Sequence, residues 1–495
     1  MSISDLGKTD KKIYIWLFII AFVVAFSSTY NPFNFRRMHV DSSVYITIAD
    51  GITRGLLPYR DFVDNKGPLA YFLSVPGLFL GKFTGIWITE IILLFITVLF
   101  SYKTALFFGD RNKALSATVF SFVVLLAFFK VYAGTEEYSL PFLIISLYLF
   151  TKYYFSQKQD FNFLELIILG ICFTCAVLIR LNMFPLWIGF CAVIFIEEIL
   201  SRRFIRLCKY ITGFCCGIII IFIPVFLYLK INFIWDEFFN QVIFGGAAKG
   251  FSAGGLKEFT KNFYLILNRN LSIIPLVIGV YWIIKRYKHL NFGYYIGYTF
   301  SYFLIVLFLS FSGGDSHYNM VLVPYFIPAL VFLFSITDSA FSMLKYKKLI
   351  LVLFFCLVFS EGLVKYFYDM SKITFDKSGS QLINAGKMID ENTKPGDKII
   401  SLGFNGYIYS FTQRNIASKY CYQGSGLNYI PGAKDEFISD ITLNKPAIIA
   451  LFINNEDGIS QIINEWHAPI FKMIDSDYRL LSDENGFNLF IRNDR

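Results

Sequence analysis

Charged side chains and turn-forming residues are concentrated in residues 39–69, directly after the first apolar run of the sequence. This stretch reads HVDSSVYITIADGITRGLLPYRDFVDNKGPL and contains four aspartates and three cations. A carboxylate in such a loop can act as a general base or as a metal ligand, and a lysine beside a glycine-proline turn can bind a phosphate. Asp41 is the first candidate for this chemistry, and Lys66 is the second.

Both residues also have a structural interpretation. Asp41 precedes Ser-Ser-Val-Tyr and can cap the amino terminus of a helix over 42–50. Lys66 can extend its ammonium group to the lipid headgroups instead of binding a ligand. Spacing alone leaves both alternatives open.

Three further groups of residues could take part in chemistry. Paired carboxylates repel each other, so Glu136 and Glu137 in YAGTEEYSLPF indicate a nearby cation or substrate, or else a solvated turn. Arg180 ends an apolar run, where an arginine tends to pair with a carboxylate or phosphate unless it extends to the lipid surface. His317 and Tyr318 follow a Gly-Gly turn and can contact a phosphate, although a lone histidine is more often structural.

Membrane helices are expected to hold these residues in place. Hydrophobic residues make up 56% of the 495-residue chain and charged residues 16%, and the mean hydropathy is +0.55, which is far too apolar for a soluble globular protein. About 20 apolar residues are needed to cross the hydrocarbon core. We predict about eleven spans, near 13–30, 86–108, 114–132, 138–155, 163–180, 183–200, 210–230, 271–284, 292–311, 319–337 and 349–367. The shorter run 69–83 is placed at the interface, with crossing as the alternative.

Lysine and arginine are concentrated in alternate loops, which predicts that these loops and the amino terminus are cytoplasmic. The opposite, outer loops then contain the long stretch 31–85, the Glu136–Glu137 turn, Arg180, the loop 231–268 and the segment 312–317. All the candidate residues are therefore predicted to lie on one side of the membrane. We assign residues 1–369 to a transmembrane catalytic domain.

After about residue 370 the sequence becomes more polar, and its apolar runs have only strand length. Strands are predicted at KIISLG (398–403), YIYSF (407–411), AIIALF (447–452), FKMI (471–474) and FNLFIR (487–492), with helices at 380–392 and 456–466. We expect a small extracytoplasmic α/β domain over residues 370–495.

The net charge of +9 does not indicate a nucleic-acid partner, because the cations fall mainly in the loops that orient the chain in the membrane. Seven of the eight cysteines lie in or beside apolar segments, so no disulfide framework is predicted.

The order of these motifs resembles the GT-C superfamily of membrane glycosyltransferases. An aspartate follows the first span, then come G-x-x-P-Y-R-D-x-x-D-N-K-G-P-L, an acidic turn before a span, and H-Y-x-x-x-x-x-P-Y-x-x-P. The nearest members are the bacterial protein O-mannosyltransferase-like and lipid A aminoarabinose-transferase-like proteins. The resemblance covers residues 10–340, and the segment 55–69 is its most specific part.

The resemblance implies a site and a reaction. Asp41 corresponds to the catalytic base or metal ligand of the family, and either Glu136 or Glu137 to its second acidic residue. The expected substrate-binding residues are Tyr59, Arg60, Asp64, Lys66, Arg180, His317 and Tyr318. If a divalent metal (Mg, Mn or Zn) takes part, Asp41 and Glu136 are its expected ligands. Because Ser42 follows Asp41 where some relatives have a second carboxylate, metal dependence stays open.

The implied donor is a polyprenyl-phosphate-linked sugar, and the implied acceptor is a hydroxyl of an envelope glycan, a lipid or a protein. Transfer would occur on the outer face of the bacterial cytoplasmic (inner) membrane, among membrane lipids, in one inverting displacement with Asp41 as base. The alternatives are a transporter or flippase of lipid-linked sugars, whose charges would lie at mid-depth on repeated, broken helices, and an O-antigen ligase or polymerase.

Overall fold

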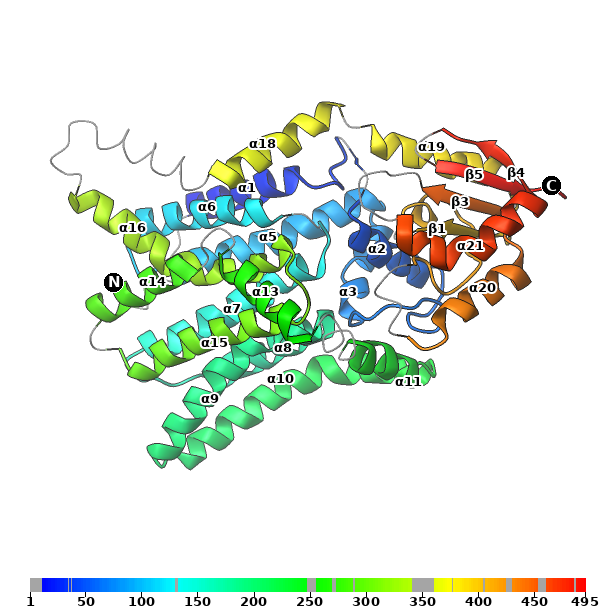
Figure 1. The fold of residues 1–495 in the computed structure, drawn as a ribbon. Coiled ribbons are helices and arrows are strands. Elements are labelled where there is room, and N and C mark those ends of the chain that lie inside the picture. Colours follow the sequence, from blue (N-terminus) through cyan, green and yellow to red (C-terminus); the bar gives the residue numbers. More distant parts are fainter. Residues whose placement is uncertain are drawn as a thin grey trace.

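A bundle of long helices and a smaller sheet-containing domain make up the computed structural model of the chain (Figure 1). The structure describes residues 11–495 except 34, 37, 130–131, 247–254, 269–272, 288–289, 341–359, 376, 404–405, 424–429, 453–459 and 485–486. The bundle forms the larger part, and the α/β domain packs at one end of it (Figure 1).

In the described part of the chain, ten apolar helices form the bundle. They are α1 (Lys11–Phe26), α5 (Phe83–Ala105), α6 (Arg111–Phe128), α7 (Thr135–Phe155), α8 (Phe163–Ile179), α9 (Pro185–Leu200), α10 (Phe204–Ile231), α14 (Ile273–Arg286), α15 (Phe292–Ser310) and α16 (Ile327–Ala340). Local signals set their starts: Asn162 and Glu165 form a capping box at α8, and Asp110 accepts two backbone N–H bonds at α6. Helix α7 packs against α5 and α8, and α8 also packs against α10.

The chain is a multi-pass membrane protein. Among the described residues, five helical segments are long and apolar enough to cross a membrane, or six if the bent pair α13 (Gly255–Asn268) and α14 is one span. Helices α1, α8 and α9 are shorter, at 16, 17 and 16 residues, so the number of about eleven spans stays a prediction. Most of the predicted span 349–367 lies outside the described residues.

Short elements connect the two parts of the molecule. Helix α2 (Val40–Thr53) and the paired short helices α3 (Leu69–Phe72) and α4 (Val75–Phe79) lie between the bundle and the α/β domain (Figure 1). Because α3 and α4 have only four and five residues, neither can cross a bilayer, which favours the interfacial placement of this segment. The same end of the bundle carries α11 (Trp235–Phe238), a π-helix η3 (Phe239–Phe244) and a 3₁₀ segment η5 (Ser316–Phe326).

The α/β domain contains a mixed five-stranded sheet in the order β2-β1-β3-β5-β4. Its strands are β1 (Lys398–Leu402), β2 (Asn415–Ile416), β3 (Ile448–Phe452), β4 (Tyr478–Ser482) and β5 (Phe487–Arg492). Strand β1 is parallel to β2 and β3, whereas β5 is antiparallel to β3 and β4. Its helices are α19 (Ser378–Glu391), α20 (Ala433–Asn444) and α21 (Ser460–Asp477), and α18 (Ser360–Phe375) leads into the domain from the bundle.

Two predicted strands were wrong. Residues 407–411 form turns and the short 3₁₀ helix η6 (Tyr409–Phe411), in which the buried Tyr409 hydroxyl accepts the N–H of Ser401 at 2.7 Å. Residues 471–474 belong to α21, and the strand follows that helix as β4. Tertiary packing buries Tyr407, Ile408 and Tyr409 in the first segment and Ile474 in the second without a strand conformation.

Candidate active site

A cavity of about 430 Å³ opens where the end of the bundle meets α2 and the loop before α3. Its polar lining includes Asp41, Lys66, Glu136, Arg180, His317 and Tyr318. Its apolar lining includes Leu181, Phe184, Val242, Ile243, Phe308 and Phe311. The structure thus brings together six of the predicted site residues from five separate segments, with the size and mixed lining expected of a small-molecule site.

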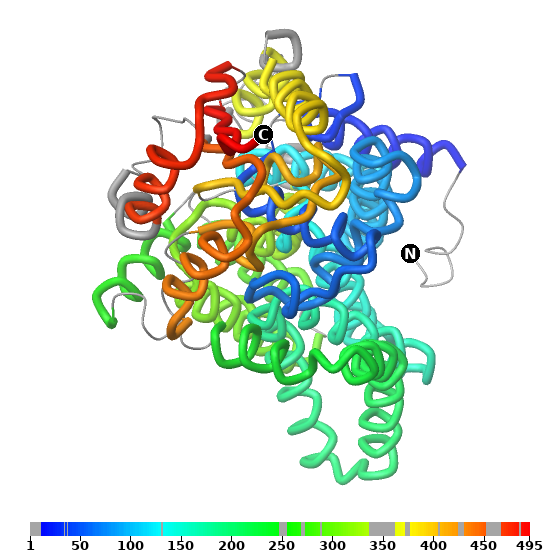
Figure 2. Tube along the Cα trace, turned by 90° about the vertical axis from the view of Figure 1, so that its right-hand side faces the viewer, coloured from blue at the N-terminus to red at the C-terminus, as the bar shows by residue number. Residues whose placement is uncertain are grey.

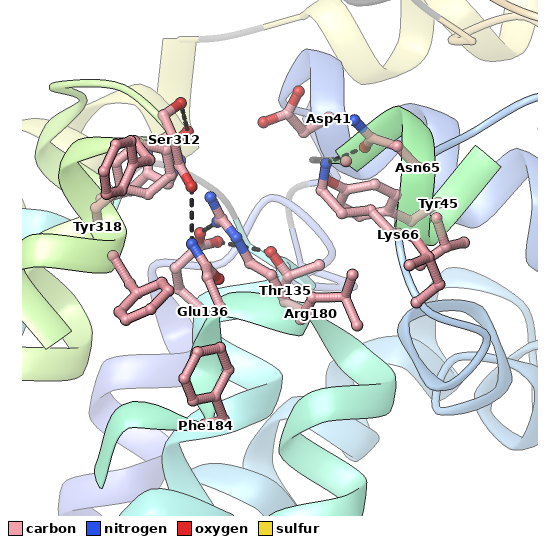
Figure 3. Close-up of a pocket in the computed structure, with 18 residues that line it drawn as sticks. Asp41, Tyr45, Asn65, Lys66, Thr135, Glu136, Arg180, Phe184, Ser312 and Tyr318 are labelled. Atoms are coloured by element: carbon pink, nitrogen blue, oxygen red, sulfur yellow. Dashed lines mark hydrogen bonds and ion pairs between the residues drawn. The ribbon is translucent and has the colours of Figure 1, made fainter. Parts of the chain in front are cut away.

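Helix α2 presents Asp41 to this cavity. His39 has an extended backbone and caps the helix, because its Nδ1 accepts the Asp41 N–H at 3.2 Å. Asp41 itself therefore lies in the first turn and is not the capping residue, so the predicted capping role was wrong. Tyr45 lies one turn further along the same face and also lines the cavity (Figure 3).

Lys66 reaches the cavity from the loop that precedes α3. Its Nζ donates to Asn65 Oδ1 at 2.8 Å and lies 6.0 Å from the centre of the Tyr45 ring. The next residue anchors the loop: Gly67 N–H donates to Ile179 O at 3.2 Å, and a Cβ on Gly67 would lie 2.0 Å from Leu178 O. Only glycine permits this close approach, so the end of α8 fixes where Lys66 can be.

The electrostatic environment of Lys66 disfavours its charged form. Burial lowers the pKa of Lys66, the neighbouring carboxylates of Asp64 and Asp41 raise it, and the Arg180 guanidinium lowers it further. A bound anion would favour the charged form of Lys66, because its negative charge would stabilise the ammonium group.

Arg180 and Glu136 form an ion pair in the centre of the cavity wall (Figure 3). Their side chains are only 11% and 4% exposed. Thr135 Oγ1 donates to Glu136 Oε2 at 2.9 Å, and the guanidinium carbon of Arg180 lies 4.6 Å from the centre of the Tyr318 ring. Arg180 leaves α8 with an extended backbone, which turns its side chain from the helix end into the cavity.

The η5 segment forms the wall opposite α2. His317 and Tyr318 are buried there, and the His317 ring centre lies 6.4 Å from that of His39. Asn182 Nδ2 donates to Ser312 Oγ at 2.8 Å and joins this wall to the turn after α8. The predicted proximity of the His317 and Asp41 segments is therefore observed.

Four predicted site residues do not line the cavity. Glu137 is 1% exposed and accepts the N–H of Ala133 at 2.8 Å. Glu90 accepts the same N–H at 2.9 Å. Arg60 lies outside on an exposed turn and bonds to Asp61. Of the two glutamates, the structure places only Glu136 in the candidate site.

Tyr59 and Asp64 are buried beneath the loop that carries Lys66. Tyr59 donates its hydroxyl to the Lys66 carbonyl at 2.8 Å, and Asp64 accepts the Tyr71 hydroxyl at 2.8 Å. They hold the loop from behind and do not reach the cavity. Within the motif, Tyr59 and Asp64 therefore stabilise the conformation of the loop. Tyr59 itself has a left-handed backbone conformation, with φ 69°.

Several lining residues carried no sequence signal that distinguished them. The aromatic wall of Phe184, Phe308 and Phe311 could not be selected among 58 phenylalanines. Tyr45 could have been found, because it lies one helical turn after Asp41 in a helix that was expected there.

The residues present do not fit a metal site. Within the described ranges, no three histidine, cysteine, aspartate or glutamate side chains lie close enough together to hold an ion. Glu136, one of the two expected ligands, is paired with Arg180.

The comparisons with known proteins concern the fold. No family model and no curated protein matches the sequence. ArnT from Cupriavidus metallidurans, solved with undecaprenyl phosphate, matches 97% of this chain over 98% of its own length, with TM-score 0.62 and 11% identity. The archaeal oligosaccharyltransferase AglB from Archaeoglobus fulgidus, solved with an inhibitory peptide and a dolichol-phosphate, matches 98% of this chain over 74% of its length, with TM-score 0.51 and 12% identity.

The chain has the GT-C fold. Both solved proteins are GT-C glycosyltransferases, so the resemblance expected from the motifs is confirmed at the level of the fold. The match to ArnT covers 97% of the chain, and the GT-C likeness therefore extends beyond residues 10–340 into the α/β domain. At this identity the comparisons establish the GT-C architecture, and the chemistry has to be argued from the cavity.

Proposed function

We propose that this protein transfers a sugar from a polyprenyl-phosphate donor to a hydroxyl group of an envelope glycan, lipid or protein. One observation carries the proposal: a carboxylate, Asp41, shares a cavity with two cations, Lys66 and Arg180. A carboxylate is the group needed to take a proton from a hydroxyl, and cations are the groups needed to stabilise a departing phosphate. A structural neighbour with the same fold was solved with undecaprenyl phosphate, which supports this class of donor.

In the proposed reaction, Asp41 accepts the proton of the acceptor hydroxyl while the hydroxyl oxygen attacks the anomeric carbon of the sugar. The bond from that carbon to the phosphate oxygen breaks in the same step, and the electron pair leaves with the polyprenyl phosphate. Lys66, Arg180 and His317 stabilise the negative charge on this leaving group. A single displacement inverts the anomeric configuration, as in inverting glycosidases.

The cavity also has an apolar side that suits a lipid-linked substrate. Phe184, Phe308 and Phe311 line it, and Figure 3 shows the Phe184 ring below Glu136 and Arg180. A polyprenyl chain can pack on these rings while its phosphate faces the cations.

The proposed site faces the outside of the bacterial cytoplasmic membrane, with the amino terminus inside and the α/β domain outside. In a cysteine-free protein, single cysteines at the exposed positions Arg60, Asp315 and Ser380 should react with a membrane-impermeant thiol reagent added from outside. A cysteine at the exposed Lys158, predicted to be cytoplasmic, should react only after the membrane is permeabilised. Labelling at Arg60 with protection at Asp315 would contradict the topology.

Lys66 should control donor use, and its contribution should depend on pH. Lys66→Ala and His317→Ala should raise the KM for the donor about tenfold or more and leave the acceptor KM nearly unchanged, because in the proposed reaction these side chains contact the donor phosphate and not the acceptor hydroxyl. Since burial lowers the pKa of Lys66, donor binding should fall as the pH rises through that lowered value. Lys66→Arg, whose charge persists, should remove this alkaline loss. An acceptor-only defect, or the same alkaline loss in Lys66→Arg, would argue against the phosphate role.

The test of the function follows the lipid carrier in proteoliposomes that contain the purified protein, a polyprenyl-phosphate sugar and a candidate acceptor glycan. A transferase releases polyprenyl phosphate and gives one glycosylated acceptor for each carrier released. A flippase moves the intact lipid-linked sugar to the other leaflet. If the donor moves to the other leaflet without being cleaved, the protein is a flippase and not a transferase.

A further inference from the structure

Helix α2 and the loop that carries Lys66 both contact the α/β domain. Each does so on the side that faces away from the cavity. Figure 2 shows this domain, in orange and red, beside the α2 region, in blue. In a helix with 3.6 residues per turn, Asp41 and Tyr45 share one face of α2, whereas Ser43 and Thr47 point about 200° away from it. The cavity lies on the face of Asp41 and Tyr45, so the face of Ser43 and Thr47 can contact another part of the protein.

That second face binds Gly406 of the α/β domain. Gly406 N–H donates to Ser43 Oγ at 2.9 Å, and Thr47 Oγ1 donates to the Gly406 carbonyl at 3.0 Å. Ser43 and Thr47 are both 0% exposed, so these bonds form away from water. A Cβ on Gly406 would lie 2.8 Å from Thr47 Oγ1 and 3.1 Å from Ser43 O, which shows how closely the domain approaches the helix.

The loop that carries Lys66 makes a second contact with the same domain. Val63 N–H donates to the Lys419 carbonyl at 3.0 Å, and the Tyr422 hydroxyl makes a longer bond of 3.4 Å to Asp64 Oδ1. Asp64 is 5% exposed, and its other oxygen accepts the Tyr71 hydroxyl. The α/β domain thus holds both the helix of Asp41 and the loop of Lys66.

We propose that the α/β domain is a structural part of the active site, with Ser43 and Thr47 as positioning residues that fix Asp41 through Gly406. Neither side chain lines the cavity, so their effect on catalysis passes through the placement of α2. The catalytic part of this proposal rests on the proposed function. The positioning part rests only on the contacts between α2 and the domain.

The positioning part can be measured without activity, by hydrogen exchange in the full-length protein. Thr47→Val removes the bond to the Gly406 carbonyl with almost no change in shape, and the α2 amides should exchange about tenfold faster. Gly406→Ala should have the same effect from the domain side, because its Cβ crowds Thr47. Thr47→Ser keeps the hydroxyl and should restore wild-type exchange. The matched control is Thr53→Val on the same helix, whose hydroxyl bonds to Asp50 O within α2.

The same variants then report on catalysis. Thr47→Val should lower kcat about tenfold and leave the donor KM within about twofold, because Asp41 is displaced while the phosphate-binding cations stay in place. Unchanged α2 exchange in both Thr47→Val and Gly406→Ala, or an equal change in Thr53→Val, would overturn the proposal. Faster exchange in a protein whose wild type releases no polyprenyl phosphate would support positioning by the domain and refute the proposed function instead.

Discussion

Asp41→Asn is expected to lower the transfer rate by about 10² to 10⁴, the usual contribution of a general base. The amide has the same shape as the carboxylate but cannot take the proton of the acceptor hydroxyl. The fold should persist, because His39 caps α2 and Asp41 is not needed for that role. The measurement is kcat in detergent, with thermal unfolding and undecaprenyl phosphate binding recorded for the same preparation.

The control for Asp41→Asn lies on the same helix. Asp50 pairs with Arg54 at 3.1 Å and does not line the cavity, and an asparagine there can still accept a bond from Arg54. Asp50→Asn should therefore keep near wild-type turnover. Near wild-type turnover in Asp41→Asn would remove Asp41 from the reaction.

Arg180→Ala should both destabilise the protein and abolish donor binding. It leaves Glu136 buried without its partner, and losing one member of a buried ion pair costs about 3–5 kcal/mol. Arg180→Gln combined with Glu136→Gln removes both charges and should recover most of the lost stability. The double variant should still fail to bind undecaprenyl phosphate, because the guanidinium of Arg180 is missing from the phosphate site.

An exposed ion pair provides the comparison for Arg180. Lys209 and Asp160 are 35% and 37% exposed, so Lys209→Ala should cost about 1 kcal/mol or less. Thermal unfolding of the four proteins in one detergent compares these costs. If Arg180→Ala is no less stable than Lys209→Ala, the pair is not buried as the structure shows.

The sequence could predict that the site residues lie close together, because successive membrane spans place the loops of the chain on alternating sides of the bilayer. Loops that follow alternate spans meet on one side of the bilayer, so charges that do not fit the orientation pattern are brought together there. Asp41, Lys66, Arg180 and His317 were selected by this reasoning, and they line one cavity.

Neighbouring residues could not be told apart in the same way. Glu136 and Glu137 differ by about 100° around a helix that is buried on all sides, so no apolar pattern shows which of them faces the cavity. Tyr59 and Asp64 belong to a loop whose shape depends on contacts with Gln241 and Tyr422, which are distant in sequence. Non-local contacts of this kind leave no periodicity to read.

The α/β domain shows the same limit. Strands were predicted at 398–403, 447–452 and 487–492 from their short apolar runs, and β1, β3 and β5 lie within these ranges. Residues 407–411 and 471–474 have similar composition but lie in a turn and in a helix. Composition identified the apolar segments, and tertiary packing decided their conformation.

A structure of the full-length protein with undecaprenyl phosphate bound tests the central claim most directly. The phosphate is expected between Lys66 Nζ and the Arg180 guanidinium, within hydrogen-bond distance of both, with the lipid chain along Phe184 and Phe308 and with Asp41 facing the open side. A phosphate bound outside this cavity, or a lipid chain that leaves Lys66 and Arg180 without contact to it, would contradict the assignment of the site.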